Sequence, residues 1–488
     1  MKVLIKFIVI AVMLISFIYI ISCERKTSPA NPNLAPNTTL ANIPVEGDTL
    51  FALVKLHWDG EDDDGFISGY QYRYITHHLL VGDSMLHDWV DTKETSVIIP
   101  FESSDLLNYQ RFQVRAVDNV RDVDVTPAER RFYTVQTIFP TTEIVFPQNK
   151  QQFFAIEQTT DWWQGVQLTF TASDQDGEVV EYAWTVDQAE WNWTNDTTIF
   201  ITPDHFNPLD GQHTLRVTSR DNTNLVDPIG DSVIVFLFKP SFAKDMLIID
   251  ETVEAKFPFG MGFKDEDVDS FYADIFGTRE MWDFGKKGMP TKEVLGQYKL
   301  IIWHADNLYT FEGDVHQLPA HIIDIMDYLN VGGDLIMSGW RILKSFAASE
   351  PFPKSFEEGT FIHDYLHILQ ADESAPLPDF NGAYSSDTLR FSDISVDSIK
   401  LSESFLTTVP VIGLQYVNVM PRRAGFTDVI YRYRNDDIKG MPKFRGYPCG
   451  LRYYGTSFDA IVLGFPMFFI RKDHAQRMAS EMLRSLGY

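Results

Sequence analysis

Cysteine is almost absent from this chain. Its 488 residues contain two, Cys23 and Cys449. No Cys-x-x-Cys pair occurs, and no cluster of Cys and His has zinc-finger spacing, which excludes the usual structural zinc sites. Disulfides therefore contribute little, and the domains must be stabilised by their packed cores.

Basic residues are also scarce. The chain has 41 Lys and Arg against 68 Asp and Glu, a formal net charge of −27. A surface of this sign repels nucleic acid, so we expect no nucleic-acid partner. It could attract divalent cations or basic proteins, although an acidic solvent-exposed exterior explains the charge most simply.

The apolar run at the N-terminus is short for a membrane span. Residues 7–21 are apolar apart from Ser16, whereas a spanning helix needs roughly 20 such residues. Lys2 and Lys6 precede the run, as in the positive region of a signal peptide. The run ends in Ile20-Ile21-Ser22-Cys23, which resembles the lipobox of bacterial lipoproteins.

The lipobox resemblance implies export and anchoring. Residues 1–22 would be a cleaved signal peptide, and Cys23 would carry the lipid, palmitate included, that holds the chain to the membrane. Glu24, where Asp would favour inner-membrane retention, points to the outer membrane. The alternative is an uncleaved transmembrane anchor. Residues 23–36 are polar and contain three prolines, so we expect an extended lipidated tether.

Residues 37–137 and 138–240 share two signatures. Asp62-x-Asp64-Gly65 matches Asp174-x-Asp176-Gly177 at an offset of 112, and Asp118-Asn119 matches Asp221-Asn222 at an offset of 103. Both regions alternate short apolar strands with turns and predict all-β sandwiches. Both copies resemble fibronectin type III, immunoglobulin-like or PKD-like modules, which implies that they act as spacers.

Residues 241–488 follow a different period. Apolar strands at 246–249, 300–303, 334–338 and 460–464 alternate with helices at 318–329 and 473–486, which predicts an α/β domain with a mainly parallel sheet. The order resembles the flavodoxin-like fold of class I glutamine amidotransferases and ThuA-like proteins. Residues 370–450 fit poorly and could be an insertion or extra strands, with candidates at 411–419 and 429–433.

The catalytic motif of that family is missing. An amidotransferase places its cysteine in a Gly-x-Cys-x-Gly elbow, but this chain reads Ile336-Met337-Ser338-Gly339-Trp340 at the corresponding position. No His-x-Glu pair lies near the C-terminus. Pro448 precedes Cys449, so we expect that cysteine to be a packed thiol rather than a nucleophile.

Polar residues nevertheless gather where a ligand would bind. In open parallel sheets, ligands bind outside the carboxyl ends of the strands. The residues expected there are Asp250, Glu251, His304, Asp306, Asn307, Ser338, Trp340 and Arg341. Ser338, His304 and Asp250 could supply a hydroxyl, a base and an acid for catalysis, although polar residues collect at strand ends in any such fold.

The acidic turns invite a calcium interpretation. Asp62 and Asp64, and in the second copy Asp174 and Asp176, have the spacing of part of a calcium loop. The first ligand is missing in both copies and no closing Glu follows, so a hydrogen-bonded turn with its glycine at positive φ is the simpler expectation. We therefore assign no cofactor from the sequence and keep Ca²⁺ as the alternative.

Three further patterns have simple structural explanations. His363 and His367 could share a helical face and bind zinc, but no third ligand is evident. The acidic run 265–269 predicts a solvated helix start. The tryptophans at 162–163 and 191–193 could stack on sugars, although packing explains them more simply.

The sequence as a whole predicts a surface or periplasmic lipoprotein. Its α/β domain would bind a glycan, peptide or protein without doing chemistry. A hydrolase acting on an extracellular polymer through the crevice is one alternative. An accessory lipoprotein of a secretion or envelope machine is another. Fold analogy alone connects this domain to any chemistry.

Overall fold

The computed structural model describes most of the chain beyond the tether. The described ranges are 32–42, 44–102, 107–135, 138–175, 177–254, 262–308, 316–347, 350–374, 378–405, 407–408, 410–436 and 443–488. The predicted signal peptide, Cys23 and Asp176 lie outside them. The chain forms two compact units: residues 1–142, 172–182 and 218–230 form one, and the remaining residues form the other.

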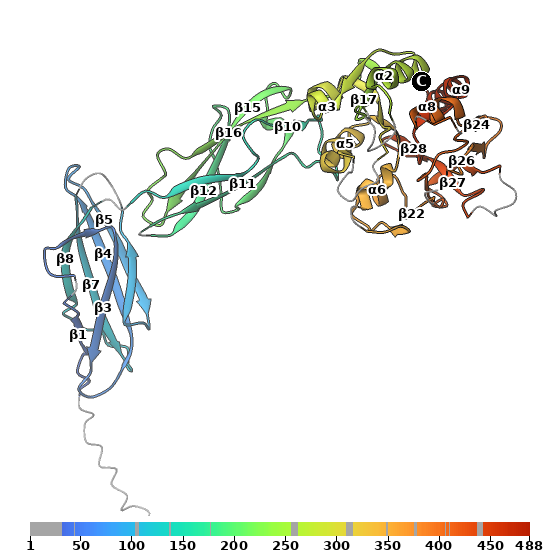
Figure 1. The fold of residues 1–488 in the computed structure, drawn as a ribbon. Helices are drawn as coiled ribbons and strands as arrows, with labels where there is room; N and C mark the ends of the chain where they lie inside the picture. Colours follow the sequence, from blue (N-terminus) through green and yellow to red (C-terminus); the bar gives the residue numbers. More distant parts are fainter. Residues whose placement is uncertain are drawn as a thin grey trace, which may run out of the picture. The chain divides into compact units, whose positions relative to one another are not determined.

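The first β-region is a sandwich of a three-stranded and a five-stranded sheet (Figure 1). Its core holds Trp58, Tyr70 and Phe112, with the Trp58 and Phe112 rings 5.9 Å apart. The smaller sheet has the order β1 (Asn37–Leu40), β3 (Leu53–Glu61), β6 (Ser96–Pro100). The larger sheet has the order β2 (Thr49–Phe51), β8 (Ala128–Val135), β7 (Asn108–Asp118), β4 (Ile67–His78), β5 (Ser84–Thr92).

The second β-region repeats this topology strand for strand. Each strand of the first sandwich has its counterpart eight strands later in the same place. The smaller sheet has the order β14 (Thr198–Ile201), β11 (Val166–Ser173), β9 (Thr141–Phe146). The larger sheet has the order β10 (Gln151–Phe154), β16 (Asp231–Phe238), β15 (Gly211–Asp221), β12 (Val179–Val186), β13 (Asn192–Thr194). The prediction of two copies of one β-sandwich is therefore confirmed.

The C-terminal region is built on a nine-stranded mixed sheet. Five strands run parallel in the order β18 (Met281–Asp283), β17 (Lys244–Asp250), β19 (Tyr298–Ala305), β20 (Asp334–Gly339), β28 (Asp459–Leu463). Four antiparallel strands extend it: β27 (Pro448–Tyr454), β26 (Thr427–Arg434), β23 (Gly382–Ser385), β24 (Ile394–Ser395). The prediction of a mainly parallel sheet holds for one half only, because much of residues 370–450 adds antiparallel strands.

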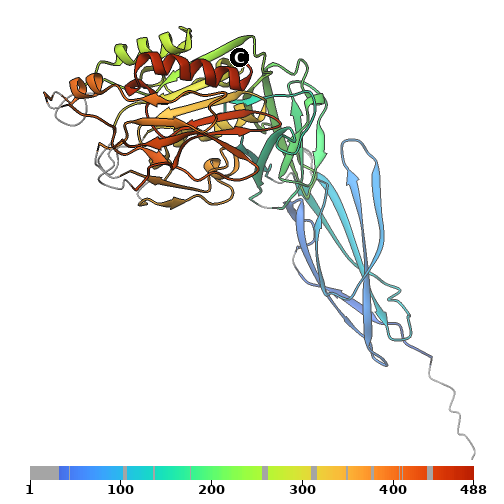
Figure 2. The same ribbon diagram turned by 90° about the vertical axis from the view of Figure 1, so that its right-hand side faces the viewer.

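Alternate residues of the parallel strands supply two cores. Ile248 and Ile302 face one core, whereas Leu247, Ile249 and Trp303 face the other, as the two-residue period of a strand requires. Helices α2 (Asp265–Phe276) and α9 (Lys472–Leu486) lie together over the first core (Figures 1 and 2). Helices α5 (Ile322–Asn330) and α6 (Ile342–Ala347) pack over the second.

The remaining elements are short. They are α3 (Phe284–Lys287), α4 (Lys292–Leu295), α7 (Phe361–Asp364), α8 (Ser398–Ser404) and a small sheet of β21 (Lys354–Ser355), β22 (Gln370–Glu373) and β25 (Asn418–Val419). Single 3₁₀ turns lie at Pro203–His205, Leu318–His321 and Met467–Phe469. The helix predicted at 318–329 is therefore present, with its first turn in the 3₁₀ form.

Candidate functional site

The site lies where the parallel sheet changes winding direction. Strand β17 has β18, the next strand in sequence, on one side and β19 on the other. The connections leaving β17 and β19 diverge at such a point and leave room at the carboxyl ends of the two strands. Asp250 ends β17, and it pairs in register with His304 on β19.

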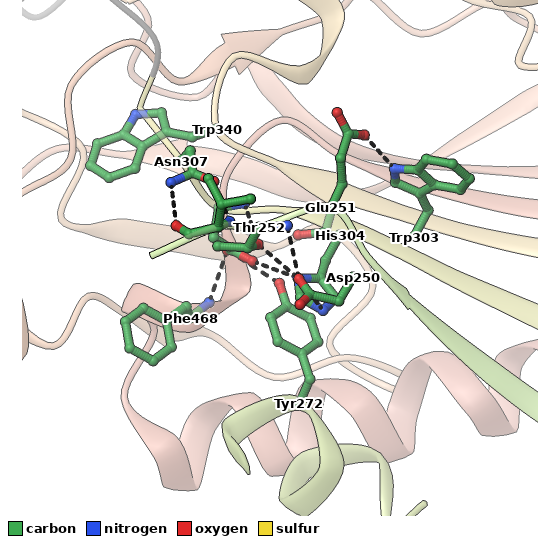
Figure 3. A network of polar contacts seen from close by, with 12 residues as sticks. Asp250, Glu251, Thr252, Tyr272, Trp303, His304, Asn307, Trp340 and Phe468 are labelled. Atoms are coloured by element: carbon green, nitrogen blue, oxygen red, sulfur yellow. Dashed lines mark hydrogen bonds and ion pairs between the residues drawn. The ribbon is translucent and has the colours of Figure 1, made fainter. Parts of the chain in front are cut away.

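His304 is the centre of a buried polar network (Figure 3). Its Nδ1 lies 3.0 Å from Asp306 Oδ2 and 3.2 Å from Thr252 Oγ1. Its Nε2 lies 3.4 Å from Asp250 Oδ1. The Tyr272 ring stacks on the imidazole with centroids 3.6 Å apart, and the Tyr272 hydroxyl donates to Asp306 Oδ1. These contacts fix the imidazole on both edges and on one face.

The electrostatics of this network are unusual. Burial raises the pKa of Asp250 to about 7; nearby Asp269 adds to the rise and His304 opposes it. Burial and Asp269 also raise the pKa of Asp265 to about 6. Burial alone would lower the pKa of His304, but Asp250 and Asp306 outweigh it and the net shift is upward. Carboxylates therefore crowd one another here, with His304 as the nearest balancing group.

Two acids of helix α2 complete the cluster. Asp250, Asp265 and Asp269 each offer a carboxylate oxygen, and these oxygens lie within 4.8 Å of one another. The prediction of a solvated acidic helix start is therefore wrong for Asp265 and Asp269, whose side chains are half-buried and four residues apart on one helical face. It holds for Asp267, which is exposed.

Several predicted crevice residues stabilise the chain itself. Glu251 accepts hydrogen bonds from Trp303 Nε1 at 2.8 Å and from the backbone N–H of Gln317. The side-chain amide of Asn307 pairs with both backbone groups of Val253, at 2.8 and 2.9 Å. Both side chains are therefore engaged by neighbouring groups of the fold.

The residues at the end of β20 are also engaged within the fold. Ser338 Oγ donates to the carbonyl of Phe465 at 3.1 Å. The Trp340 side chain is fully buried, and its Nε1 donates to the carbonyl of Gln415 at 2.7 Å. Arg341 pairs with Glu373 through two hydrogen bonds of 2.7 and 3.1 Å. Of the eight residues expected in the crevice, seven are therefore buried and Arg341 is half-buried.

The acidic turns of the two sandwiches explain their shared signatures. A Cβ on Gly65 would meet Asp62 Oδ2 and Asn119 Oδ1, and a Cβ on Gly177 would meet Asp174 Oδ2 at 2.6 Å and Asn222 Oδ1 at 2.8 Å. Both signatures thus converge on one glycine in each copy. The prediction of positive φ at these glycines is wrong. Glycine is favoured there for another reason: side-chain oxygens approach so closely that a Cβ would collide with them.

Calcium binding at these turns remains a prediction. Asp62 Oδ1 accepts the backbone N–H of Asp64, whose own carboxylate accepts the N–H of Leu34. Asp176 of the second copy lies outside the described residues. Within the described ranges, the cluster at Asp250 is the only place where three or more Asp, Glu, His or Cys side chains are close enough for one ion.

Of the other sequence patterns, the histidine pair and Cys449 have structural explanations, and the tryptophans do so only in part. Helix α7 ends at Asp364 and His367 has φ of 52°, so His363 and His367 do not share a helical face. Cys449 is fully buried, as predicted, and burial raises the pKa of its thiol well above the usual range. Trp163 is buried, whereas Trp162, Trp191 and Trp193 are exposed, so the packing expectation is confirmed for Trp163 only.

Sequence reasoning missed four members of the site. Thr252 and Tyr272 carry no motif, and Asp265 and Asp269 were placed on the solvent side. The spacing of the two acids was a usable signal, because residues four apart on a helix face the same way. Which face would meet β17 was not readable, since the acids at 265, 266, 267 and 269 together cover more than one face of the helix start.

Comparisons with known proteins found similarity to solved structures only. No family model matches the chain, and no curated protein does. Among solved structures, the fibronectin(III)-like modules of Clostridium thermocellum CbhA are 16% identical over 42% of this chain and 95% of theirs, with a TM-score of 0.19. The chicken CNTN1 FN1–FN3 domains are 13% identical over 42% of this chain and 66% of theirs, with a TM-score of 0.16.

A third similar structure belongs to a 1.5-MDa bacterial ice-binding adhesin, 10% identical over 44% of this chain and 72% of that chain, with a TM-score of 0.16. The neighbours of the N-terminal part are thus fibronectin III-like and immunoglobulin-like modules. Scores this low show nothing about function. Separately, none of the helices in the described ranges is both long enough and apolar enough to cross a membrane.

Proposed function

We propose that the protein is a lipid-anchored protein of the bacterial cell envelope whose C-terminal domain binds a partner without covalent chemistry. The lipid would be attached at Cys23, and the two sandwiches would serve as spacers. The C-terminal domain would be a divergent member of the flavodoxin-like fold that amidotransferases share. Its parallel strand order, second-first-third-fourth-fifth in the order of the chain, supports that assignment.

The contacts of Ser338 and His304 support a non-catalytic domain. A hydrolase of this kind needs a nucleophile hydrogen-bonded to a base. Here Ser338 donates to the carbonyl of Phe465, and His304 is directed to Asp250, Thr252 and Asp306. Among the described side-chain hydrogen bonds, none joins Ser338 to His304. Cys449, the remaining thiol, is buried with a raised pKa and is a poor nucleophile.

The burial of the crevice restricts what the partner would contact. A glycan or protein cannot reach side chains that are buried, so recognition would use the outer surface of the domain. The chain offers an acidic exterior, with a net charge of −27, which favours a basic partner over an anionic one.

Membrane fractionation tests the anchor. Cys23→Ala should move the full-length protein from the membrane to the soluble fraction and abolish labelling by a palmitate analogue. Cys449→Ala is the matched control and should leave both unchanged. Cys23→Ala protein that stays in membranes would contradict lipid anchoring.

Activity assays test the non-catalytic assignment. The purified full-length protein should not hydrolyse ester, peptide or glycan substrates above background. The assignment fails if Ser338→Ala abolishes a hydrolytic activity that Ser270→Ala, an exposed serine on α2, retains. Binding to envelope glycans or basic peptides should be the same for wild type and Ser338→Ala.

A further inference from the structure

The acidic cluster beside β17 has the geometry of an ion site. The candidate ligand oxygens of Asp250, Asp265 and Asp269 all lie within 4.8 Å of one another. The centre of a triangle with 4.8 Å sides is about 2.8 Å from each corner, so an ion there would be at most that far from each oxygen. Ca²⁺–oxygen distances are about 2.3–2.6 Å, whereas Mg²⁺ requires about 2.0–2.1 Å. The three carboxylate oxygens would thus need to move inward only slightly to bind Ca²⁺, and further to bind Mg²⁺.

Each of the three carboxylates has one buried oxygen without a hydrogen-bond partner among the described residues. These atoms are Oδ2 of Asp250, Oδ1 of Asp265 and Oδ1 of Asp269. Asp250 is wholly buried. Leaving a buried carboxylate oxygen unpaired is costly, and three such atoms close together indicate a missing positive partner.

A second observation comes from His304, which belongs to a different strand. The side chain is completely buried, and its Nε2 has no hydrogen-bond partner among the described residues. That nitrogen points to Asp250 Oδ1 at 3.4 Å, while Asp306 and Thr252 hold the opposite nitrogen. An imidazole positioned in this way can orient a ligand carboxylate by donating to its second oxygen.

The charges in the cluster also call for a cation. Asp250, Asp265, Asp269 and Asp306 can contribute four negative charges, and His304 can contribute one positive charge. Besides His304, the cationic side chain that lowers the pKa of Asp265 is Lys286, which is exposed and pairs with Asp283. A divalent ion would reduce the excess from three negative charges to one. The donors are hard oxygens, which suit Ca²⁺ better than the softer transition metals.

We propose that Asp250, Asp265 and Asp269 bind one Ca²⁺ ion, with His304 as the residue that positions Asp250. The ion would connect the end of β17 to the first turns of α2. This site does not depend on the lipid anchor or on the partner proposed above. It differs from the acidic turns of the sandwiches, where the sequence alone pointed to calcium.

Calorimetric titration of the EDTA-treated full-length protein with CaCl₂ tests the site. Wild type should bind one Ca²⁺ per chain at this site. Asp269→Asn should weaken that binding by roughly tenfold or more, because ligand charge sets calcium affinity. Asp306→Asn should weaken it by about 10- to 100-fold if His304 must be held in place. Asp267→Asn, the same change on the exposed face of α2, is the matched control and should bind as wild type does.

Thermal unfolding separates a lost ligand from a damaged fold. In EDTA, Asp265→Asn and Asp269→Asn should unfold at or above the wild-type temperature, because each removes a repelling charge. Adding CaCl₂ should raise the melting temperature of wild type and Asp267→Asn but not of the two cluster variants. A misfolded variant would melt at a lower temperature than wild type both in EDTA and in CaCl₂, and its loss of Ca²⁺ binding would then not support the proposed site.

Three results would overturn the proposal. One is the absence of Ca²⁺ binding up to about 1 mM, the weak limit for extracellular calcium modules. Another is binding that Asp269→Asn leaves intact but Asp62→Asn removes. The third is tighter binding of MgCl₂ or MnCl₂ than of CaCl₂ at the same residues.

Discussion

Aspartates have opposite roles in the sandwiches and in the α/β domain. Asp227, in the second sandwich, is buried and accepts backbone N–H groups of Thr142, Ile229 and Gly230 at 2.9–3.0 Å. Burial alone would raise its pKa, but these hydrogen bonds outweigh burial and the net shift is downward. Asp250 is buried and Asp265 is half-buried, and their pKa values rise mainly because of burial, with neighbouring carboxylates adding to the rise.

Burial raises the pKa of all three aspartates, and only for Asp227 do hydrogen bonds to the carboxylate reverse the sign of the net shift. A backbone N–H stabilises the charged carboxylate, so Asp227 is a structural anion. A neighbouring carboxylate destabilises the charge, so the cluster at Asp250 retains unfavourable energy that a cation could remove. The atoms that face each carboxylate therefore distinguish Asp227, which stabilises a loop, from the cluster at Asp250, which could bind a ligand.

The largest effect is expected from removing a structural anion. Asp227→Ala removes the acceptor of three N–H groups, of which that of Thr142 is in a buried hydrogen bond and those of Ile229 and Gly230 are in partly buried ones; an unpaired buried N–H costs about 1–3 kcal/mol. We expect a loss of about 3 kcal/mol or more in the free energy of unfolding, measured by urea denaturation at pH 7. Glu190→Ala, an exposed acid of the same sandwich, should change it by less than about 0.5 kcal/mol. A loss that small for Asp227→Ala would contradict the structural role.

A smaller loss is expected where the repeated signatures converge. Gly65→Ala introduces a Cβ against Asp62 and Asn119, and Gly177→Ala introduces one against Asp174 and Asn222. The Cβ at Gly65 would displace the ends of Asp62 and Asn119, which accept the backbone N–H groups of Asp64 and Phe66, and each hydrogen bond lost costs about 0.5–1.5 kcal/mol. Thermal unfolding followed by calorimetry measures it. If Asp63→Ala, in the same exposed turn, costs as much as Gly65→Ala, close packing is not the reason for the glycine.

The smallest effect is a difference in pH dependence. The folded-state pKa of Asp265 is raised to about 6, so the folded protein keeps this proton to higher pH than the unfolded chain. Its contribution to stability is full below the unfolded value and is lost as pH rises through about 6. In EDTA, wild type should lose about 1 kcal/mol relative to Asp265→Asn between pH 4 and 7, after allowance for solvent screening.

Asp227 should show the opposite sign. Its pKa is lowered in the folded state, so its contribution is present above the unfolded value and is lost as pH falls through the folded one. The advantage of wild type over Asp227→Ala should therefore shrink on acidification. Urea midpoints measured at a series of pH values test both directions. If the stability difference between wild type and variant changes in the same direction with pH at Asp227 and Asp265, the contrast between the two aspartates is wrong.

The sequence predicted the positions of the strands better than their pairing within the sheets. The strands expected at 246–249, 300–303 and 334–338 lie within β17, β19 and β20. The two signatures that residues 37–137 and 138–240 share predicted a repeat, and both sandwiches have the same strand order. Within residues 370–450, the candidate strand at 429–433 lies in β26, whereas the candidate at 411–419 contains only β25 at its end. Strands β23 and β24 were not predicted, because such short antiparallel strands take their stability from pairing with β26 and with each other.

The candidate site shows the same limit. Its strand-end residues Asp250, His304 and Asp306 could be located from the sequence, since parallel strands expose their carboxyl ends together. Asp265 and Asp269 could not, because a run of acids at a helix start is compatible with solvent or with a site. The packing of Val268, Phe271 and Tyr272 against the sheet turns those two acids toward Asp250.

The sequence by itself determined the periodic parts of this protein: two copies of one β-module, the alternating strands and helices that follow, and the absence of an amidotransferase elbow. Tertiary structure decided which charges meet. The three carboxylates come from positions up to 19 residues apart, and the imidazole that faces them lies 54 residues beyond Asp250. Contacts across such separations depend on how strands and helices pack, which local periodicity does not encode.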